Sequence, residues 1–532
     1  MTKGSIQIRL SIAGVHPAEG HGPRGCKVSR SEGHVTARTL LRRLVLIACL
    51  TAICRPLWNL IAAAANTNPP QSDVRDFGAA CDGVADDSAP LAAAVGALRG
   101  TGFALHVSGR CRLRLAGSRQ VWLKDISIVG DGGREFGTAG QVGSTILIDT
   151  AIAAPFVASD NWGLERLKFV WPHQTETVAA ANGGVPIAYP PLVTARSGDS
   201  VQNWRFNDNQ VENAYDIIDL SNAAGAGHFY YRRNQTFALR YHLRLRSVGG
   251  ESWITDNQFT PQAFLLGVVA SGTTYLRNYA STHAEALRIE GNGTAETPST
   301  LSVDGMRMTG NYGLLLRYGI HVVGGSLNLA TLTADSWDEV STPLAVESGG
   351  GIFATTITGG TWLCQRGWDT SFAAPCLIVD GGAPGSNLLM TGVDIAVVAG
   401  PGIVFHATGI GASLNVSGGR IANVGQMSVG NPFTGIEFNA PEGSLTLAAF
   451  ELTTTATAQR TASGIVIESA WTSVVSGLSL IGWGRPLVYT TKTGNHAVTG
   501  SISVESQRSA AGGPAVSGMG AALVAQAGNA WH

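Results

Sequence analysis

A strand-and-turn unit that repeats along most of the chain is the feature that most constrains its fold. Short apolar stretches alternate with turns, and successive units begin near Val201, His228, Glu251 and Thr273 and continue past Trp471. The spacing is about 22–35 residues, the period at which solenoid proteins stack one supersecondary unit on the next. One such unit is too small to bury its own apolar side, so neighbouring units have to share a core. The repeat predicts a single long stack of β-strand coils.

The composition agrees with a folded chain that is rich in turns. The 532 residues include 68 Gly, 14% are charged and 44% are hydrophobic, whereas average soluble proteins carry about 7% Gly and about 25% charged residues. This hydrophobic fraction excludes an intrinsically disordered protein. The formal net charge of −1 gives no electrostatic reason to expect a nucleic-acid partner.

Residues 1–65 are expected to form a leader. They hold nine Lys or Arg and two acidic residues, and the rest of the chain holds 27 basic and 35 acidic residues, a net charge of −8. Arg42 and Arg43 precede an apolar run over 44–53, and Ala62–Ala65 follow, which is typical of a secretory signal. The run is shorter than the ~20 residues of a transmembrane helix. We expect a secreted or periplasmic protein without a stable membrane span; an uncleaved anchor and a cytoplasmic or virion protein are the alternatives.

The cysteines outside this leader form two sequence pairs. Removal of the leader leaves four of the seven cysteines, namely Cys81, Cys111, Cys364 and Cys376. An even number of cysteines in an exported protein permits disulfides. We predict that Cys81 bonds to Cys111 and Cys364 to Cys376, with buried free thiols as the alternative. Since no CxxC or histidine cluster accompanies them, a zinc site is not expected.

Side chains of one kind recur at matching turns. The early units share an asparagine in the same context, and stacking would place these amides above one another, where each can hydrogen-bond to the next coil. The predicted ladder consists of Asn209, Asn234, Asn257, Asn278 and Asn311.

A motif near residue 73 identifies a related family. The segment Asp73–Leu91 reads DVRDFGAACDGVADDSAPL, in which Asp86, Asp87 and Ser88 offer N-cap oxygens to a helix that begins after them. It resembles the opening of the pectate-lyase-like superfamily, and the similarity extends to Ile126–Gly132. Its aspartates are interpreted as structural groups that cap and turn the chain.

The resemblance implies a fold and a range of activities. The family folds as a right-handed parallel β-helix whose first helix caps the coil. We therefore predict an all-β chain with one such solenoid and a short N-terminal capping helix. In this interpretation 66–72 are a linker, 73–130 the cap and first coils, 131–505 the remaining coils and 506–532 an Ala/Gly-rich tail. The family includes polysaccharide lyases, glycosidases, epimerases, phage tailspikes and non-catalytic members, so the fold does not settle the function.

A second strand in each unit carries the candidate chemistry. Its first and third residues are apolar, as in Leu287-Arg288-Ile289-Glu290, so its second and fourth residues point outward. One outward column comprises Asp219, Arg244, Arg288, His321 and Ala345, and the other comprises Ser221, Arg246, Glu290, Val323, Glu347, Asp380 and His406. Coils lie ~4.8 Å apart, so the charged members of adjacent coils should cluster.

These residue types suit glycan chemistry. Guanidinium groups pair with sugar carboxylates, and proton transfer needs a histidine or a carboxyl group. Inverting glycosidases need two carboxylates ~6.5–9.5 Å apart, which two coils can supply. The predicted catalytic residues are Asp219, Arg288, Glu290 and His321, and the predicted substrate-binding residues are Arg244, Arg246, His283, Glu285 and Trp337. The alternative interpretations are surface ion pairs for the charged residues and packing for the tryptophan.

A second cluster and several absent motifs complete the analysis. Asp335, Asp338 and Glu339 flank Trp337 and are the second candidate for catalytic carboxylates. Phosphate-cradling loops and metalloprotease motifs are absent from the sequence, and neither a cofactor nor a metal is predicted. We predict an exported protein that acts on an acidic extracellular polysaccharide as a lyase or a glycosidase. The alternative is a non-catalytic glycan-binding surface or tailspike-like protein, the latter a homotrimer.

Overall fold

The computed structural model describes residues 70–499 and three later strands, with short internal gaps. The gaps are 116–119, 133–142, 262–274, 295–296, 298, 348, 366–372, 397, 426–431, 456–461 and 491–493, and the later strands are β44 (Ser503–Glu505), β45 (Val516–Ser517) and β46 (Leu523–Ala527). The expected leader and most of the expected linker and tail lie outside these residues.

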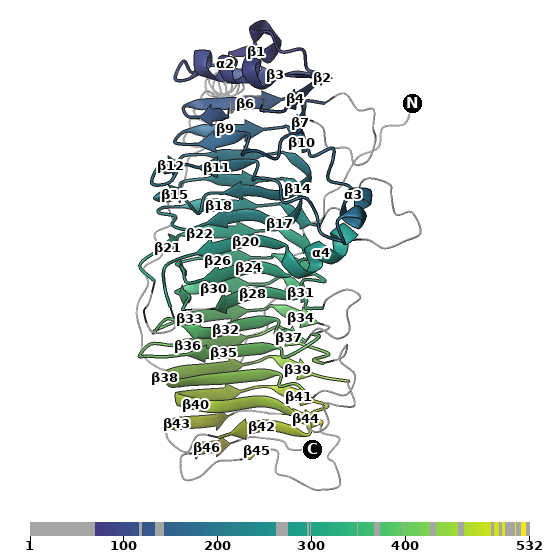
Figure 1. The fold of residues 1–532 in the computed structure, drawn as a ribbon. Coiled ribbons are helices and arrows are strands. Elements are labelled where there is room, and N and C mark those ends of the chain that lie inside the picture. The colour runs from purple at the N-terminus through teal and green to yellow at the C-terminus, as the bar shows by residue number, and fades with distance from the viewer. Residues whose placement is uncertain are drawn as a thin grey trace, which may run out of the picture. The chain divides into compact units, whose positions relative to one another are not determined.

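Each coil contributes strands to three faces, and paired strands run parallel (Figure 1). Face 1 begins with β1 (Gln71–Asp73), β3 (Ala104–Val107) and β6 (Ile126–Gly130). Face 2 begins with β2 (Asp82–Asp86), β4 (Arg110–Leu113) and β7 (Thr145–Ile148). Face 3 begins with β5 (Val121–Leu123), β8 (Phe156–Ala158) and β11 (Val193–Ala195).

Later coils repeat this order. β14 (Gln210–Asp219) and β17 (Gln235–Leu245) each run from face 2 onto face 3, because their first residues pair with face-2 strands and their last residues with face-3 strands. Face 3 then continues through β20 (Glu285–Glu290), β24 (Tyr318–Val323) and β28 (Thr342–Glu347). The predicted all-β class and single parallel β-helix are confirmed.

The N-terminal end is closed by the predicted helix. α2 (Ser88–Leu98) buries Leu91, Val95 and Leu98 against the first coils. The carboxylate of Asp87 does not cap this helix; its side chain instead accepts backbone N–H bonds from Ala80, Cys81 and Arg112. Asp86 accepts the backbone N–H of Ser88 at 3.1 Å. These aspartates therefore hold the opening turn in place.

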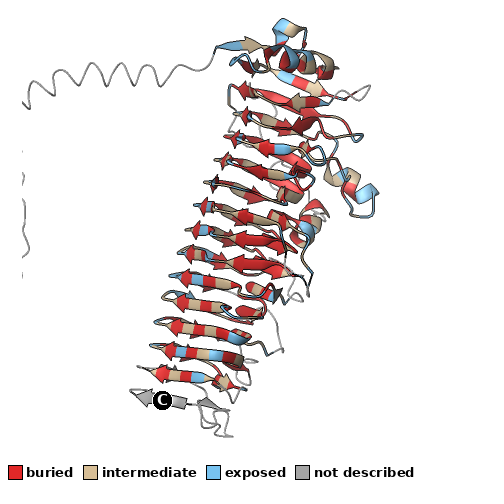
Figure 2. Cartoon of the chain, turned by 90° about the vertical axis from the view of Figure 1, so that its left-hand side faces the viewer, coloured by how far each residue is buried: buried red, intermediate tan, exposed pale blue. Residues whose placement is uncertain are grey.

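The core lies inside the coils, and buried residues recur on successive strands along the stack (Figure 2). Trp162 stacks on Trp204 at a centroid distance of 5.1 Å, and Trp204 stacks on Phe229 at 4.2 Å. Trp337 and Trp362 pair in register on adjacent coils, and each is only 2% exposed. Identical spacing of parallel strands brings equivalent apolar positions into contact, so each coil covers the open side of its neighbour.

The asparagine ladder forms, with one predicted member replaced. The Oδ1 atom of Asn234 accepts the backbone N–H of Asn209, that of Asn257 accepts the N–H of Asn234, and that of Asn311 accepts the N–H of Asn257, at 3.0–3.1 Å. Asn278 was wrongly included, because it lies in α4 (Tyr275–His283), which the chain inserts within one coil between its face-2 strand β19 (Gln258–Thr260) and its face-3 strand β20. The rung after Asn311 is Asp335, whose Oδ1 accepts both the backbone and the side-chain N–H of Asn311.

Asp335 is a buried carboxyl group at the end of this ladder. In the rungs before it, each asparagine side-chain N–H donates to a carbonyl of the preceding coil, as Asn311 does to Ile254 at 2.8 Å. The Oδ2 atom of Asp335 is buried without a hydrogen-bond partner, and burial raises the pKa of Asp335 to about 7 although Asn311 opposes the shift. Protonation would give Asp335 the donor that its neighbours possess. Gly360 occupies the next rung, where a Cβ would lie 2.3 Å from the Asp335 carbonyl oxygen, so no side chain continues the ladder.

Both predicted disulfides are present. Cys81 is bonded to Cys111 and Cys364 to Cys376, and all four cysteines are buried. Within the part of the chain that the structure describes, no helix has the length and apolarity needed to cross a membrane.

We predict that Asp335→Asn stabilises the protein at alkaline pH. The folded-state pKa lies above the unfolded value of 3.8, so the parent protein loses stability as the pH rises from about 4 through 7. An amide supplies the missing donor and does not ionise. The free energy of unfolding of the variant, measured in urea, should exceed that of the parent by roughly 1–3 kcal/mol at pH 8 and match it near pH 4. A difference independent of pH would contradict this account.

The disulfide assignment predicts the thiol content of denatured, unreduced protein. Alkylation followed by peptide mass analysis should leave Cys81, Cys111, Cys364 and Cys376 unmodified until a reductant is added. Modification of these four cysteines before reduction would reject the assignment.

Candidate functional site

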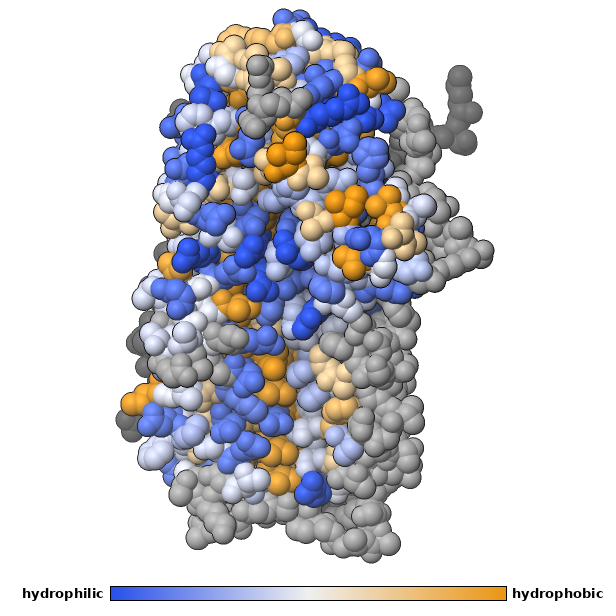
Figure 3. Space-filling model, viewed as in Figure 1, coloured by the Kyte–Doolittle hydropathy of each residue, from blue (hydrophilic) through white to orange (hydrophobic). Residues whose placement is uncertain are grey.

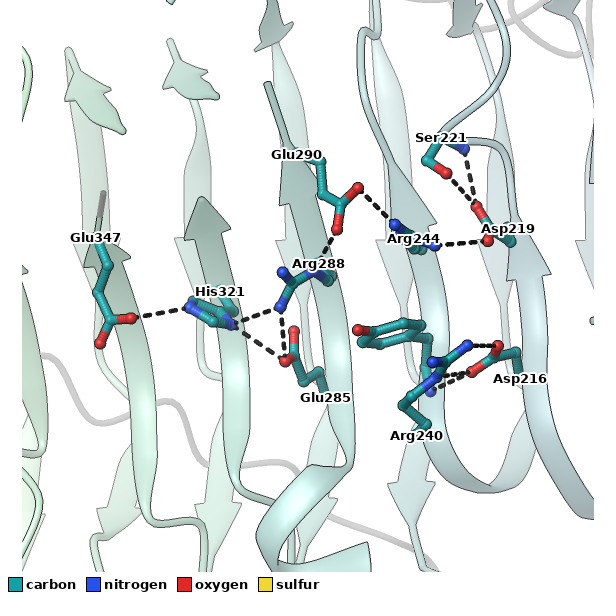
Figure 4. A network of polar contacts seen from close by, with 11 residues as sticks. Asp216, Asp219, Ser221, Arg240, Arg244, Glu285, Arg288, Glu290, His321 and Glu347 are labelled. Carbon is teal, nitrogen blue, oxygen red and sulfur yellow. Dashed lines mark hydrogen bonds and ion pairs between the residues drawn. The ribbon is translucent and has the colours of Figure 1, made fainter. Parts of the chain in front are cut away.

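A continuous network of charged side chains covers five adjacent strands of face 3 (Figure 4). In the register of the strands, Asp219 pairs with Arg244, Arg244 with Arg288, Arg288 with His321 and His321 with Ala345. The predicted outward column is therefore the observed one. The face-3 network is defined as Asp216, Asp219, Arg240, Arg244, Glu285, Arg288, Glu290, His321 and Glu347.

Two arginines link carboxylates across three coils. Arg244 donates to Asp219 at 2.9 Å and to Glu290 at 2.6 Å. Arg288 donates through Nε to the other oxygen of Glu290 at 2.6 Å and through Nη1 to Glu285 at 3.0 Å. Glu290 thus receives a guanidinium on each oxygen. Burial opposes ionisation of Glu290, but these two donors outweigh it and lower its pKa.

His321 lies between two carboxylates. Its Nδ1 is 3.1 Å from Oε1 of Glu285, and its Nε2 is 3.3 Å from Oε2 of Glu347. Burial disfavours the imidazolium, but the bonds to Glu285 and Glu347 prevail and raise the pKa of His321. The hydrogen bond from His321 in turn lowers the pKa of Glu347. A protonated imidazole is therefore the favoured partner of the two carboxylates.

An aromatic ring packs against the network from β17. The guanidinium carbons of Arg240, Arg244 and Arg288 lie 4.5, 5.3 and 5.4 Å from the ring centroid of Tyr241. Arg240 pairs in a bidentate manner with Asp216, whose carboxylate also accepts the backbone N–H of Tyr241. Cation–π contacts of this kind hold guanidinium groups close to the ring face.

Two helices border the network where faces 2 and 3 meet. α4 contacts α3 (Glu176–Ala181) through a bond from the Leu276 backbone N–H to Glu176 at 3.3 Å. The hydroxyls of Tyr215 on β14 and Tyr279 on α4 lie 3.0 Å apart. Hydrophilic side chains gather at the middle of this side of the molecule, and a more apolar patch lies at the level of the two helices (Figure 3).

The network is more buried than surface ion pairs usually are. Only 7% of the His321 side chain and 6% of the Glu285 side chain are exposed, against 17% for Arg288 and 25% for Arg244. The charged residues do form ion pairs, as the alternative interpretation held, but these pairs are largely removed from solvent and are not ordinary exposed ones. Glu290 at 23% and Glu347 at 35% are the more accessible carboxylates beside them.

Most predicted site residues meet in this network, and three do not. Arg246 is exposed just beyond the end of β17. His283 ends α4, where its ring stacks on Tyr279 at 4.0 Å. The prediction that Trp337 binds substrate is wrong, because its side chain lies in the core and cannot stack on a sugar. The packing interpretation of this tryptophan is the right one.

The second-ranked acidic cluster is dispersed. Asp335 serves the ladder, and Asp338 accepts the hydroxyl of Tyr312 at 3.0 Å. Burial and the neighbouring Asp338 raise the pKa of Glu339. These three carboxyl groups thus have different partners and do not form one catalytic site.

The analysis of the repeat did not single out Asp216, Arg240 and Tyr241. They lie where β14 and β17 bend between faces, and the strand pairing shifts register there. Glu347 was placed in an outward column but given no role. The signal for it was its position two coils from Glu290 in the same column.

Comparison with known proteins gives similar solved structures only. No protein-family model matches the chain, and no curated protein matches its sequence. The A-module of a mannuronan C-5 epimerase from Azotobacter vinelandii is 14% identical with a TM-score of 0.40, covering 85% of this chain and 99% of that one. DFA-IIIase from Arthrobacter chlorophenolicus, in complex with GF2, is 12% identical with a TM-score of 0.43, covering 71% and 94%.

A third similar structure is the catalytic unit of a thermostable GH87 α-1,3-glucanase from Streptomyces thermodiastaticus. It is 13% identical with a TM-score of 0.36, and the match covers 86% of this chain and 70% of that one. At such identities the roles of individual residues have to be argued from this chain.

We predict that Arg288→Ala destabilises the fold far more than removal of an exposed arginine. The substitution leaves Glu285 without a guanidinium, and Glu290 with that of Arg244 alone, in a poorly solvated place, at a cost of roughly 2–3 kcal/mol in the free energy of unfolding. Arg420→Ala is the matched control, since Arg420 makes a bidentate pair with Asp394 but is 47% exposed; its loss should cost less than about 1 kcal/mol. Equal costs in urea denaturation would contradict this prediction.

Proposed function

We propose that the protein hydrolyses a polysaccharide that lies along face 3, with the face-3 network as the reaction centre. The observation that carries the proposal is the pair Glu290 and Glu347. Both side chains are partly exposed, and both stand in the same outward column with Val323 between them.

The spacing of this pair suits inversion at the anomeric carbon. Two parallel steps of ~4.8 Å separate their strands by ~9.6 Å, and inverting glycosidases hold their carboxyl groups ~6.5–9.5 Å apart so that water fits between substrate and base. The strand separation therefore lies at the upper edge of that range; Glu347 leans toward Glu290 through its contact with His321, and Glu290 is held by Arg244 and Arg288 (Figure 4). A retaining mechanism needs the closer spacing of ~5 Å.

The surroundings of the two carboxylates assign their roles. Glu290 accepts from two guanidinium groups, so it stays ionised and is the base that activates water. Glu347 adjoins His321, whose raised pKa keeps a proton available. The His321–Glu347 pair is the acid that delivers this proton to the leaving oxygen. Glu285 accepts the Nδ1–H of the protonated imidazole from the other side, while the nearby Arg288 charge opposes protonation and is outweighed by the two carboxylates.

The charge balance of the network bears on the substrate. Five carboxylates face three arginines and one histidine, and Arg244 and Arg288 each pair with two carboxylates. Their guanidinium groups are engaged already, so a neutral glycan fits this surface better than the acidic one that the arginine row suggested. The acidic lyase substrate stays a second candidate, favoured by the exposed Arg246 beside the network.

Non-catalytic glycan binding is the alternative from another class. The charged groups around Glu290 satisfy one another's hydrogen-bonding and electrostatic needs, and a network with a purely structural role would do the same. Export remains part of the proposal, because two buried disulfides suit an oxidising compartment.

We predict that Glu290→Gln and Glu347→Gln each lower turnover by about 10²–10⁴-fold on a polysaccharide that the parent protein cleaves. Glu251→Gln is the control, because Glu251 pairs with Arg307 on exposed surface; its turnover should equal that of the parent. The assay measures new reducing ends over a panel of neutral and acidic polysaccharides, with product anomers followed by NMR. Release of unsaturated uronates would favour the lyase, and binding without products the non-catalytic alternative.

We predict that the rate falls as the pH rises through the raised pKa of His321. The acid must be protonated to act, so activity is present below that pKa and is lost above it. Glu290 must be ionised, so its lowered pKa places the other limb of the profile below the usual range of a glutamate. His321→Gln should remove the alkaline limb. A rate that increases with pH across this range would assign His321 as a base instead.

A further inference from the structure

A second group of titratable side chains lies on face 3, farther along the stack. β32 (Leu377–Gly382), β35 (Ile403–Ala407), β38 (Ile436–Ala448) and β40 (Ser463–Ser476) pair in this order. They carry Asp380, His406, Glu437 and Glu468 respectively. One ligand atom each from His406, Glu437 and Glu468 lies within 4.8 Å of the others.

We propose that His406, Glu437 and Glu468 bind a divalent transition-metal ion such as Zn²⁺. Zinc takes a histidine nitrogen at ~2.0–2.1 Å and carboxylate oxygens at ~2.0–2.2 Å, in tetrahedral sites whose donors lie roughly 3.3 Å apart. One donor atom of each residue lies within 4.8 Å of the other two, and the exposed Glu468 is able to rotate toward the ion. One imidazole with two carboxylates suits zinc better than it suits calcium, which takes oxygen ligands.

The arrangement around the three ligands supports the proposal. His406 Nε2 lies 2.9 Å from Glu437, and its Nδ1 lies 3.5 Å from Asp380. A metal on Nε2 would leave Nδ1–H to donate to Asp380, which is the carboxylate–histidine–metal arrangement that orients metal-binding imidazoles. Asn439 donates to Glu468 at 3.0 Å, so a second ligand is also positioned by a neighbour.

The charges distinguish this group from the face-3 network. The groups that act on His406 include the three carboxylates Glu437, Asp380 and Glu468, whereas the carboxylate of Glu290 is balanced by two arginines. A surplus of negative charge around one imidazole favours a bound cation. Three protein ligands also leave a fourth position open for water or an anionic group.

Two other histidines show that a position between two carboxylates is not enough to make a histidine a candidate metal ligand. His106 contacts Asp73 through Nδ1 and Asp131 through Nε2, at 2.9 and 2.8 Å. His321 likewise has one carboxylate on each nitrogen. In both cases the carboxylates lie on opposite sides of the ring and do not converge. His406 also has a carboxylate on each nitrogen, but here one oxygen each from Glu437 and Glu468 lies within 4.8 Å of the same ring nitrogen and of each other.

The test is zinc titration of the full-length protein after chelator treatment and thiol alkylation, by calorimetry. We expect one saturable site, at least tenfold weaker binding in His406→Ala and in Glu468→Gln, and parent-like binding in His106→Ala. Asp380→Asn should weaken binding by about 10–100-fold without abolishing it. Substituting Co²⁺ gives a spectroscopic readout, since imidazole and carboxylate ligation lacks thiolate charge-transfer bands.

Thermal melting separates metal binding from misfolding. Zn²⁺ should raise the melting temperature of the parent and of His106→Ala, and leave that of His406→Ala unchanged, while all three melt alike without metal. Absence of saturable zinc binding by the parent, or parent-like affinity in His406→Ala, would overturn the assignment. Neither result depends on whether the protein cleaves a glycan.

Discussion

Parallel backbone pairing in register is the constraint on which the rest of the structure depends. Each strand places its residues ~4.8 Å from the equivalent residues of the next coil, so every side chain has a fixed neighbour above and below. Each position therefore needs a side chain that interacts favourably with the equivalent side chains of the two adjacent coils. Aromatic rings stack, amides exchange hydrogen bonds and charges alternate, as Trp162 on Trp204, Asn234 on Asn257 and Asp219 on Arg244 illustrate.

The same constraint explains why polar chemistry gathers on face 3. In this outward column Asp219 is followed by two neighbouring arginines, Arg244 and Arg288, and then by His321. Glu285 and Glu290 on the strand of Arg288 compensate the two like charges. Each charge is then held by its neighbours, and the helix pair α3 and α4 borders the row where the chain leaves face 2. Beyond His321 the column turns apolar through Ala345, Ile378 and Val404. Function on this surface is therefore confined to short stretches where polar residues interrupt the column.

Sequence alone was sufficient for the fold and for the columns, since both follow from local periodicity. The apolar first and third positions of Leu287-Arg288-Ile289-Glu290 are enough to place its arginine outward. Burial of the network was not predictable, because Tyr241 lies where β17 bends between faces and α4 is inserted between two strands of one coil. Asn278 shows the converse error: its sequence context imitates a ladder rung, yet the residue belongs to the inserted helix. His406, Glu437 and Glu468 are about thirty residues apart in the chain, and Glu468 lies at an irregularity in the pairing of β38 with β40. Counting positions along the outward columns therefore did not predict that these three residues lie close together.

The amide ladder ends at Asp335, and this gives the stack a direction. In a solenoid each coil is coupled mainly to its two neighbours, so fraying from one end advances coil by coil until it meets a stronger junction. Rungs up to Asp335 are joined by side-chain hydrogen bonds, whereas Gly360 has no side chain with which to continue this series into the next coil. Fraying from the C-terminal side would therefore halt near that rung. Glu347 lies on β28 of the same coil as Asp335, and Glu290 and His321 lie on the two coils before it, so the whole of the proposed acid–base pair lies on the side of the stack that such fraying would leave intact.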